Sequence, residues 1–527
     1  MGGSSGGRTV VLGVDSLDLM LVERWAAQGV LPFFQSMLRD GSLVRLSGVT
    51  REMHGAVWPS LLGGRSLGHH GSFYLTQLTG GTYNLDRVEA DQVPLDPYYG
   101  RLDANGVRCA IVDIPNDMPL KGFKGLHVVD WLTEFQTWRF TTQPASIKRQ
   151  IEDGLGALNK AGGYGPTRDS LEGHRLLQRK LEKSIVMKST FMKGLLERND
   201  LDHIFVVFAE AHKAGHFLWK YTDPSHPDHV QDAYLRDSLL GIYRLLDKHL
   251  AELAGKLTHR DNLIIFSDQG MQANYRGDQF IGTILERLGL CGTERASRLE
   301  DVSTQSAGAD NASHRARSAL RALITRITPE SIGRELRRWF GAAGRVDWSR
   351  TRVFSLPTNR NSFLRVNLRG REPEGIVARG KEYDDLLKFI EGEFRALVNA
   401  ETGKPAVEAV FRIQELFPGE RADDLPDIAI LWHSDVPINA VQSPRLGRID
   451  IPVREDRSGN HRSEGFLLAR GPGIEPQVRD LHGDIMQIPG TMLALHGIPC
   501  PDYYEMPPLS DLLARDRTLQ RSRAHAG

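Results

Sequence analysis

Long hydrophobic runs, cysteine pairs and an excess of charge are all missing from this 527-residue sequence. No apolar run approaches the roughly 18 residues that a membrane-spanning helix needs, so we expect no membrane contact. Cys109, Cys291 and Cys500 lie far apart and form no CxxC pair, which argues against a disulfide scaffold and a thiolate metal site. The formal net charge of zero removes the electrostatic case for binding nucleic acid.

Targeting segments are also absent from the first residues, MGGSSGGRTVVLGVDS. They lack the positively charged stretch and apolar core of a signal peptide, and position 6 is glycine where a myristoylation pattern needs Ser or Thr. We therefore expect a soluble, cytoplasmic protein whose partner is a small molecule. The sequence leaves its oligomeric state open.

Four short apolar runs predict buried parallel strands, because they are continuous rather than alternating. These runs are Val10–Val14, Cys109–Val112, Ile204–Phe208 and Leu263–Phe266. Stretches with helical periodicity separate them, among them Leu19–Gln28 and LPFFQSMLRDG, which ends at a glycine as a capped helix does. Alternating strands and helices predict an α/β fold with a mostly parallel central sheet flanked by helices.

The composition changes near residue 295, which suggests a division into segments. We expect residues 8–294 and 436–515 to form the two parts of the main α/β domain. Residues 346–435 have the pattern of a smaller α+β lid, with a strand pair followed by a helix over Tyr383–Val398. Residues 295–345 begin polar and continue as a basic helical stretch, which favours a surface insertion or, alternatively, a partner-binding helix.

Polar side chains follow three of the predicted strands. Asp15 ends VVLGVD, Asp268 follows LIIFS, and Glu210, His212 and His216 come just after IFVVF. In open α/β sheets, ligand sites form at the carboxyl ends of the strands, so these side chains could converge on one crevice. The spacing of four between the two histidines places both imidazoles on one helical face, which suits a shared metal ion.

Each of these features has an ordinary structural explanation as well. A carboxylate after a strand more often caps a helix than binds a ligand, and an isolated H-x-x-x-H pair is structural about as often as metal-binding. His461, in a glycine-flanked loop of SGNHRSEGFLLARGPG, would by itself be a hydrogen-bonded loop residue. Their joint occurrence at strand ends nevertheless favours a metal centre.

The order of these segments resembles the alkaline-phosphatase superfamily, in its type I phosphodiesterase/nucleotide pyrophosphatase branch, from about residue 8 to 511. SDQGM is similar to the family's Ser-Asp-His-Gly-Met element, and HRSEG to its His-Arg-x-Glu-Gly stretch. The first strand with Asp15, VWPSLLGGRSLGHHG, and the closing segment IMQIPGTMLALHGIPCP resemble further family elements. The combination in this order is specific, although no single motif is.

The resemblance implies two divalent cations, usually zinc, held at the strand ends. Transferred position by position, one ion would bind His212, His216 and His461, and the second would bind Asp15, Asp268 and Gln269. This chain departs from the family pattern at three of the matched positions. The family usually has Asp at the position of His212 and His at that of Gln269, and its Thr or Ser nucleophile falls at His54.

These departures change the chemistry that we expect. Three imidazoles are a sound zinc set with a fourth position for water, whose pKa such an ion lowers towards about 7. Two carboxylates and an amide would favour Mg²⁺ or Mn²⁺, or bind Zn²⁺ weakly. We therefore expect one or two Zn²⁺ ions, with Mn²⁺ or Mg²⁺ as alternatives in the second set. Replacing Asp by His makes the centre more cationic, which should favour an anionic ester.

Several roles remain open around the nucleophile position. His54 could attack through a phosphohistidine, act as a general acid, bind a metal ion or be structural. Thr50 and Ser60 are alternative nucleophiles, and the pair His69–His70 reads as turn residues beside the site. Glu210 either orients a ligand histidine or caps a helix.

Arginines and asparagines of the predicted lid could grip an anionic substrate. The candidates in PTNRNSFLRVN are Arg360, Asn361 and Arg365, with Asn367 a weaker one. The guanidinium group offers a planar fork to phosphate oxygens, although these residues could equally lie on a solvated strand edge.

The leading hypothesis is a metal-dependent hydrolase of a phosphodiester or a related phosphoryl or sulfuryl ester. Because the usual nucleophile is replaced by His54, metal-activated water is the favoured attacking group. The alternatives are a catalytically degenerate family member that binds an anionic ligand or partner, and a phosphoryl transferase.

Overall fold

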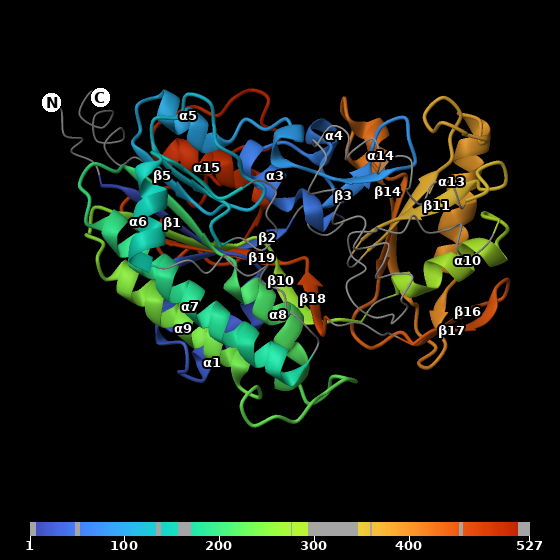
Figure 1. Ribbon diagram of the computed structural model, residues 1–527, viewed down its shortest axis with the longest axis horizontal. Helices are drawn as coiled ribbons and strands as arrows, with labels where there is room; N and C mark the ends of the chain where they lie inside the picture. The colour runs from blue at the N-terminus through green and yellow to red at the C-terminus, as the bar shows by residue number, and fades with distance from the viewer. Residues whose placement is uncertain are drawn as a thin grey trace, which may run out of the picture. The chain divides into compact units, whose positions relative to one another are not determined.

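The computed structural model contains a large α/β part and a smaller, mainly antiparallel part (Figure 1). It describes residues 7–47, 53–132, 139–155, 170–275, 277–292, 346–358, 361–452 and 457–514. Of His54 it describes the backbone alone. The predicted insertion at 295–345 therefore lies outside the described residues.

A nine-stranded sheet forms the centre of the molecule's larger part, in the order β20-β2-β19-β9-β1-β8-β5-β6-β7. In chain order its strands are β1 (Thr9–Val14), β2 (Ser42–Ser47), β5 (Cys109–Val112), β6 (Leu126–Val129), β7 (Thr141–Gln143), β8 (His203–Phe208), β9 (Asn262–Ser267), β19 (Gly465–Arg470) and β20 (Leu481–Asp484).

The four predicted apolar runs are neighbours in this sheet. β9, β1, β8 and β5 lie side by side, run parallel and are buried along their whole length. Burial on both faces explains why their sequences are continuously apolar. The sheet is mixed rather than wholly parallel, because β19 pairs antiparallel with both β2 and β9, and β7 pairs antiparallel with β6. The predicted α/β fold is confirmed.

Helices cover both faces of the sheet (Figure 1). One layer contains α1 (Leu19–Ala27), α2 (Pro32–Asp40), α7 (Leu171–Leu196), α8 (Glu210–Thr222) and α9 (Ser238–Ala254). Their apolar side chains share one core with those of β1, β5 and β8. The other layer includes α3 (Val57–Gly63), α5 (Tyr98–Ala104) and α15 (Ile488–Leu495). The two helices predicted after the first strand correspond to α1 and α2, and Gly41 follows α2 as expected.

The chain divides into two compact units, and the division differs from the boundaries drawn from the sequence. Unit 1 comprises Met1–Ser72, Glu89–Asn274 and Arg454–Gly527, and unit 2 comprises Phe73–Val88 and Tyr275–Val453. The return to the main unit therefore comes after residue 453 rather than at 436. The reason is packing, because the apolar side chains of residues 438–449 belong to the core of unit 2.

Unit 2 has the α+β character predicted for the lid. Its main sheet, in the order β11-β12-β15-β14, consists of β11 (Val353–Leu356), β12 (Ser362–Val366), β14 (Val407–Arg412) and β15 (Ile428–Trp432). The helix α13 (Lys381–Arg395) corresponds to the one expected over Tyr383–Val398 and packs on β14. A second sheet joins β13 (Val398–Asn399), β16 (Ala440–Ser443) and β17 (Gly447–Asp450).

Residues 73–88 form the hairpin of β3 (Thr76–Leu78) and β4 (Leu85–Arg87) and belong to unit 2 although they are far from it in sequence. The link is Tyr83, whose ring stacks on Trp348 with centroids 3.5 Å apart. Its hydroxyl also donates to Asn367 Oδ1 at 2.6 Å. Among the described residues, no helix combines the length and apolarity needed to cross a membrane.

Candidate metal centre

Three parallel strands deliver the predicted polar residues to one edge of the sheet. Asp15 follows β1, Asp268 follows β9, and α8, which carries His212 and His216, starts two residues after β8. Because β1 pairs with both β8 and β9, these chain ends are adjacent. His461 arrives on β18 (Gly459–Arg462), which pairs with β10 (Gly270–Ala273) so that His461 faces Met271.

A glycine, Gly459, lets the elements that carry the histidines come close together. A Cβ atom at Gly459 of β18 would clash with the carbonyl oxygen of Gly215 on α8. A side chain at position 459 would therefore push β18 away from the helix. The close approach places the Gly459 carbonyl oxygen within reach of His216, and it fixes how near His461 lies to the two helical histidines.

The three histidines form one buried cluster. The Nε2 atom of His212 lies 3.0 Å from that of His216 and 3.3 Å from that of His461. The centroids of the three rings are 4.7 to 4.8 Å apart, so the rings stand at the corners of a nearly regular triangle. Within the described part of the chain, this is the only group of three or more His, Cys, Asp or Glu side chains with ligand atoms close enough to share a metal ion.

The opposite ring nitrogen of each histidine contacts an oxygen atom. His216 Nδ1 donates to the Gly459 carbonyl oxygen at 2.8 Å, and His212 Nδ1 donates to Asp15 Oδ2 at 3.0 Å. His461 Nδ1 lies 3.4 Å from Ser16 Oγ. A carbonyl or carboxylate oxygen can only accept, so Nδ1 carries the proton in His216 and His212. Their Nε2 atoms then present lone pairs when the rings are neutral.

Lone pairs that face one another at this distance repel unless a cation lies between them. Three imidazole nitrogens bound to one zinc ion at about 2.0 Å in tetrahedral geometry are roughly 3.3 Å apart. The two separations from His212 Nε2, 3.0 and 3.3 Å, are close to that value, and all three ligand atoms lie within 4.8 Å of one another. Hydrogen bonds from Nδ1 to oxygen acceptors are also the usual way in which ligand histidines are oriented. The donor set therefore fits a zinc ion.

Asp15, Asp268 and Gln269, the second predicted set of ligands and here called the carboxylate set, are arranged around Ser16. This serine was not among the candidates drawn from the sequence. Ser16 donates its backbone N–H to Asp268 Oδ1 at 3.0 Å and its hydroxyl to Asp15 Oδ1 at 3.0 Å. The Gln269 amide donates to the Ser16 hydroxyl at 3.4 Å. Ser16 has φ of +54°, a strained value for a residue with a side chain. The signal for it in the sequence was its place directly after Asp15.

Asp268 is fully enclosed, and one of its oxygens has no partner. Asp268 Oδ1 accepts the Ser16 N–H, whereas Oδ2 is buried without a hydrogen bond. Burial, and then the nearby Asp15 carboxylate, raise the pKa of Asp268 well above the usual range of an aspartate. An anionic Asp268 is thus unfavourable unless a positive group approaches Oδ2.

Glu210 contacts a buried lysine rather than a ligand histidine. Its Oε1 accepts from the Ser184 hydroxyl and lies 3.5 Å from Lys188 Nζ. Lys188 also pairs with Asp113 Oδ2 at 2.8 Å and donates to the Val207 carbonyl oxygen at 2.9 Å. Burial alone would lower the pKa of Lys188, but the Asp113 and Glu210 carboxylates outweigh it and raise that pKa. The acceptor that orients His212 is Asp15, not Glu210.

Of the three candidate nucleophiles, the structure describes the side chain of Ser60 alone. His54 begins a short 3-10 turn, His54–Ala56, directly before α3, and Thr50 lies outside the described residues. Ser60 is buried on α3, with its hydroxyl 3.0 Å from His70 Nε2. His70 Nδ1 accepts the Ser72 N–H at 3.1 Å, so its proton is on Nε2 and points at Ser60. A histidine in this state cannot take the serine proton, which argues against Ser60 as the nucleophile.

The lid residues that we considered for substrate binding are largely engaged within unit 2. Arg365 is buried, pairs with Glu372 at 2.7 Å and donates to the Leu425 carbonyl oxygen. Asn367 donates to three backbone carbonyl oxygens, and its own amide oxygen accepts from Tyr83. Asn361 is buried, and Arg360 lies outside the described residues. The contacts of Arg365 and Asn367 hold unit 2 together.

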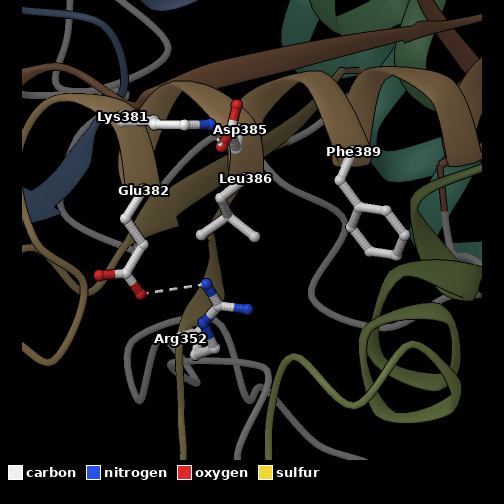
Figure 2. A pocket seen from close by; sticks show the side chains of 6 residues that line it. All are labelled: Arg352, Lys381, Glu382, Asp385, Leu386 and Phe389. Atoms are coloured by element: carbon white, nitrogen blue, oxygen red, sulfur yellow. Dashed lines mark hydrogen bonds and ion pairs between the residues drawn. The ribbon is translucent and has the colours of Figure 1, made fainter.

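A cavity of about 430 Å³ lies on unit 2 (Figure 2). Side chains of α13 and Arg352 surround it, and Leu386 and Phe389 supply its apolar surface. Its charged groups are paired, Arg352 with Glu382 at 3.3 Å and Lys381 with Asp385 at 2.7 Å. It contains none of the predicted site residues.

Comparisons with known proteins agree with the sequence motifs. The family model for type I phosphodiesterase/nucleotide pyrophosphatase matches residues 9–422. No curated protein matches the chain significantly. Crystal structures of phosphonoacetate hydrolase from Sinorhizobium meliloti 1021, with phosphonoacetate and with phosphonoformate, match at TM-scores of 0.54 and 0.52. Both are 12% identical and cover 93% of this chain and 95% of the other.

A murine ectonucleotide pyrophosphatase/phosphodiesterase 5 structure matches at a TM-score of 0.48 with 11% identity, covering 96% of this chain and 100% of the other. At such identities the phosphonoacetate hydrolase structures show a shared fold, which is alkaline-phosphatase-like. The match of the family model over most of the chain shows more. The chain belongs to the type I phosphodiesterase/nucleotide pyrophosphatase family of the alkaline-phosphatase superfamily.

Proposed function

We propose that this chain is a metal-dependent hydrolase of a phosphodiester or a related phosphoryl or sulfuryl ester. The observation that carries the proposal is the three-histidine cluster, in which three Nε2 atoms face one another within a member of this family. His212, His216 and His461 would hold the ion, and three neutral imidazoles favour Zn²⁺. When bound, such an ion polarises an ester oxygen and lowers the pKa of a neighbouring water.

The protein's own groups have separate tasks in this proposal. Asp15 and the Gly459 carbonyl keep two imidazoles in the tautomer whose Nε2 atoms can bind a metal ion. His54, at the family's nucleophile position, would hold or deliver a proton to the leaving group, while water attacks. Asn361 and Arg360 remain the candidates of unit 2 for contacting the negative charge of a small anionic ester.

The proposal is tested with purified protein, an aryl phosphodiester, an aryl phosphomonoester and an aryl sulfate, each with added Zn²⁺ or Mn²⁺. We expect hydrolysis of at least one ester, lost together with the bound metal in His461→Ala. His259→Ala, which changes an exposed histidine, is the matched control and should retain both. If no ester is hydrolysed although the metal is bound, the chain binds an anionic ligand or partner instead.

His54→Ala separates water attack from attack by His54 itself. Reduced but measurable activity fits the acid role proposed here. Complete loss in this variant, together with an acid-labile phosphohistidine trapped in the parent protein during turnover, would contradict water attack. A burst of product in the parent would point the same way, because direct hydrolysis by water accumulates no covalent intermediate.

A further inference from the structure

The two oxygens of Asp15 face different partners. Oδ2 accepts from His212 Nδ1 at 3.0 Å, and Oδ1 accepts from the Ser16 hydroxyl at 3.0 Å. His212 already points its Nε2 atom towards the other two histidines. Asp15 therefore contacts Nδ1 of His212, the ring nitrogen that does not face the other histidines. From this position a carboxylate orients an imidazole towards a metal ion.

Asp268 and Gln269, the other two residues of the carboxylate set, both contact Ser16. Asp268 Oδ1 accepts the Ser16 N–H, and the Gln269 amide donates to the Ser16 hydroxyl. Only Asp268 Oδ2 is buried without a partner among the oxygens of Asp15 and Asp268. A carboxylate oxygen that accepts one hydrogen bond keeps a second lone pair, but Asp268 Oδ2 is the one oxygen of the two residues that a cation could approach without competing with a hydrogen bond. A cation held there would have to fill most of its coordination sphere with water, whereas the histidine cluster offers three protein ligands.

The donor chemistry points in the same direction. The carboxylate set contains no imidazole or thiolate, and its amide is a weak ligand for zinc. In contrast, all three residues of the histidine cluster are imidazoles whose Nε2 atoms converge. The three-histidine cluster thus has its possible metal ligands close together, whereas the carboxylate set forms a hydrogen-bond network around Ser16.

We propose that the chain holds a single divalent ion, in the three-histidine cluster, and that Asp15 orients His212 instead of binding a second ion. This inference rests on the proposed function only in taking the histidine cluster as a metal site. Asp15 is then a positioning residue: it keeps the proton on Nδ1 of His212 and increases the basicity of Nε2. Ser16 connects Asp15 with Asp268 and Gln269 through hydrogen bonds, so the carboxylate set holds Asp15 in the position from which it orients His212.

A matched pair of variants tests the inference. Asp15→Asn and Asp268→Asn make the same change of a carboxyl group to an amide at neighbouring buried residues, yet only Asp15 contacts a ligand histidine. The full chain is stripped with a chelator, its fold is checked by near-ultraviolet circular dichroism, and it is titrated calorimetrically with Zn²⁺ and then Mn²⁺. Elemental analysis after dialysis gives the number of ions bound.

We expect one equivalent of ion in the parent protein and in both variants. Asp15→Asn should bind zinc about 10–100-fold more weakly, the usual effect of losing an orienting partner, and Asp268→Asn should stay within about threefold of the parent. Two equivalents in the parent, falling to one in both variants, would overturn the inference and leave the hydrolase proposal intact. An unchanged zinc affinity in Asp15→Asn would also overturn it. One bound ion without ester hydrolysis would contradict the hydrolase proposal alone.

Discussion

The three-histidine cluster and the cluster around Lys188 occupy the same edge of one sheet, and both are buried. Asp113 follows β5 and Glu210 begins α8, so the Lys188 cluster is built from strand ends just as the histidine cluster is. They differ in where positive charge comes from. Lys188 supplies a positive charge to two carboxylates. In the histidine cluster, the Nε2 atoms present lone pairs, and the carboxylate of Asp15 contacts Nδ1 of His212.

This difference explains why only one of the two clusters is a candidate functional site. In the Lys188 cluster the ammonium group already pairs with Asp113, and burial raises the pKa of Glu210, so the cluster has its own cation, and removing that cation would leave a buried carboxylate without its counter-charge. A cluster of converging nitrogen lone pairs becomes favourable when an external cation binds. Buried polar groups at strand ends are therefore not sufficient evidence of a functional site. A buried cluster that has no cation of its own is stronger evidence, because it can bind one.

The largest effect should come from removing the internal cation. Lys188→Met leaves the Asp113 and Glu210 carboxylates buried without their partner, and we expect the free energy of unfolding to fall by about 3–5 kcal/mol. Chemical denaturation measures this change. Lys183→Met, on the exposed face of the same helix, should change it by less than about 0.5 kcal/mol. A similar small change in Lys188→Met would remove the distinction between the clusters.

Zinc should stabilise the parent protein and Lys188→Met by the same amount. At a free zinc concentration of 100 times Kd, binding to the folded state raises the free energy of unfolding by about 2.7 kcal/mol. His216→Ala should abolish this increment, because it removes one of three ligand nitrogens. His259→Ala, an exposed histidine, should retain it. Equal zinc stabilisation in His216→Ala would show that the metal binds elsewhere.

A smaller effect is expected from separating the two elements that carry the histidines. Gly459→Ala introduces a clash with the Gly215 carbonyl oxygen and displaces the acceptor of His216 Nδ1. We expect zinc affinity to fall about 10–100-fold in calorimetric titration, as it does when orienting partners are lost. Gly194→Ala is the control, since a Cβ there meets open space on α7. Undiminished zinc affinity in Gly459→Ala would mean that this close approach does not set the site.

The smallest effect concerns His203, which is buried, and His496, which is partly buried; this pair needs no cation. His203 Nδ1 lies 3.2 Å from His496 Nε2, and His203 Nε2 lies 3.2 Å from the Tyr98 hydroxyl. Burial, and then the neighbouring His496, lower the pKa of His203 well below its usual value. The unfolded chain therefore binds a proton, near pH 6.5, that the folded chain does not.

The stability of the metal-free protein should consequently fall as the pH is lowered below about 6.5, by up to about 1.4 kcal/mol per pH unit for this group. Stability from this pair is present above the unfolded pKa and is lost towards acid, because the lowered pKa of His203 keeps the folded state from taking up the proton. Denaturation at pH 7.5 and pH 5.5 of the parent and of His203→Gln measures the difference. An identical pH dependence in both proteins would contradict the assignment.

Local sequence patterns were sufficient for the central strands and for bringing His212 and His216 to the edge of the sheet. β1, β5, β8 and β9 are continuous apolar runs because both of their faces are buried, and that pattern is visible without a structure. The rule that parallel strands present their carboxyl ends at one edge then places Asp15, His212 and Asp268 together. His461 could be added through its family motif, although its position depends on pairing with β10.

Contacts between segments that are far apart in the sequence could not be predicted from local patterns. The hairpin of β3 and β4 belongs to unit 2 through Tyr83, whose partners Trp348 and Asn367 are far away in sequence. Likewise, Glu210 has the spacing of an orienting partner for a histidine, but the nearby Lys188 on α7 attracts it instead. Ser16 stands directly after Asp15, but that position alone did not reveal its role, because the role depends on three residues that meet only in the folded sheet.

The position of β19 has a consequence for the order in which the protein is made. β19 lies between β2 and β9, so the central sheet stays divided until residues near the end of the chain leave the ribosome. His461 precedes β19 by a few residues and is the last of the three histidines to be synthesised. Domains generally fold as units, and pairings between distant strands form slowly. Metal binding by a growing chain would therefore report that synthesis has passed unit 2 and that the sheet has closed.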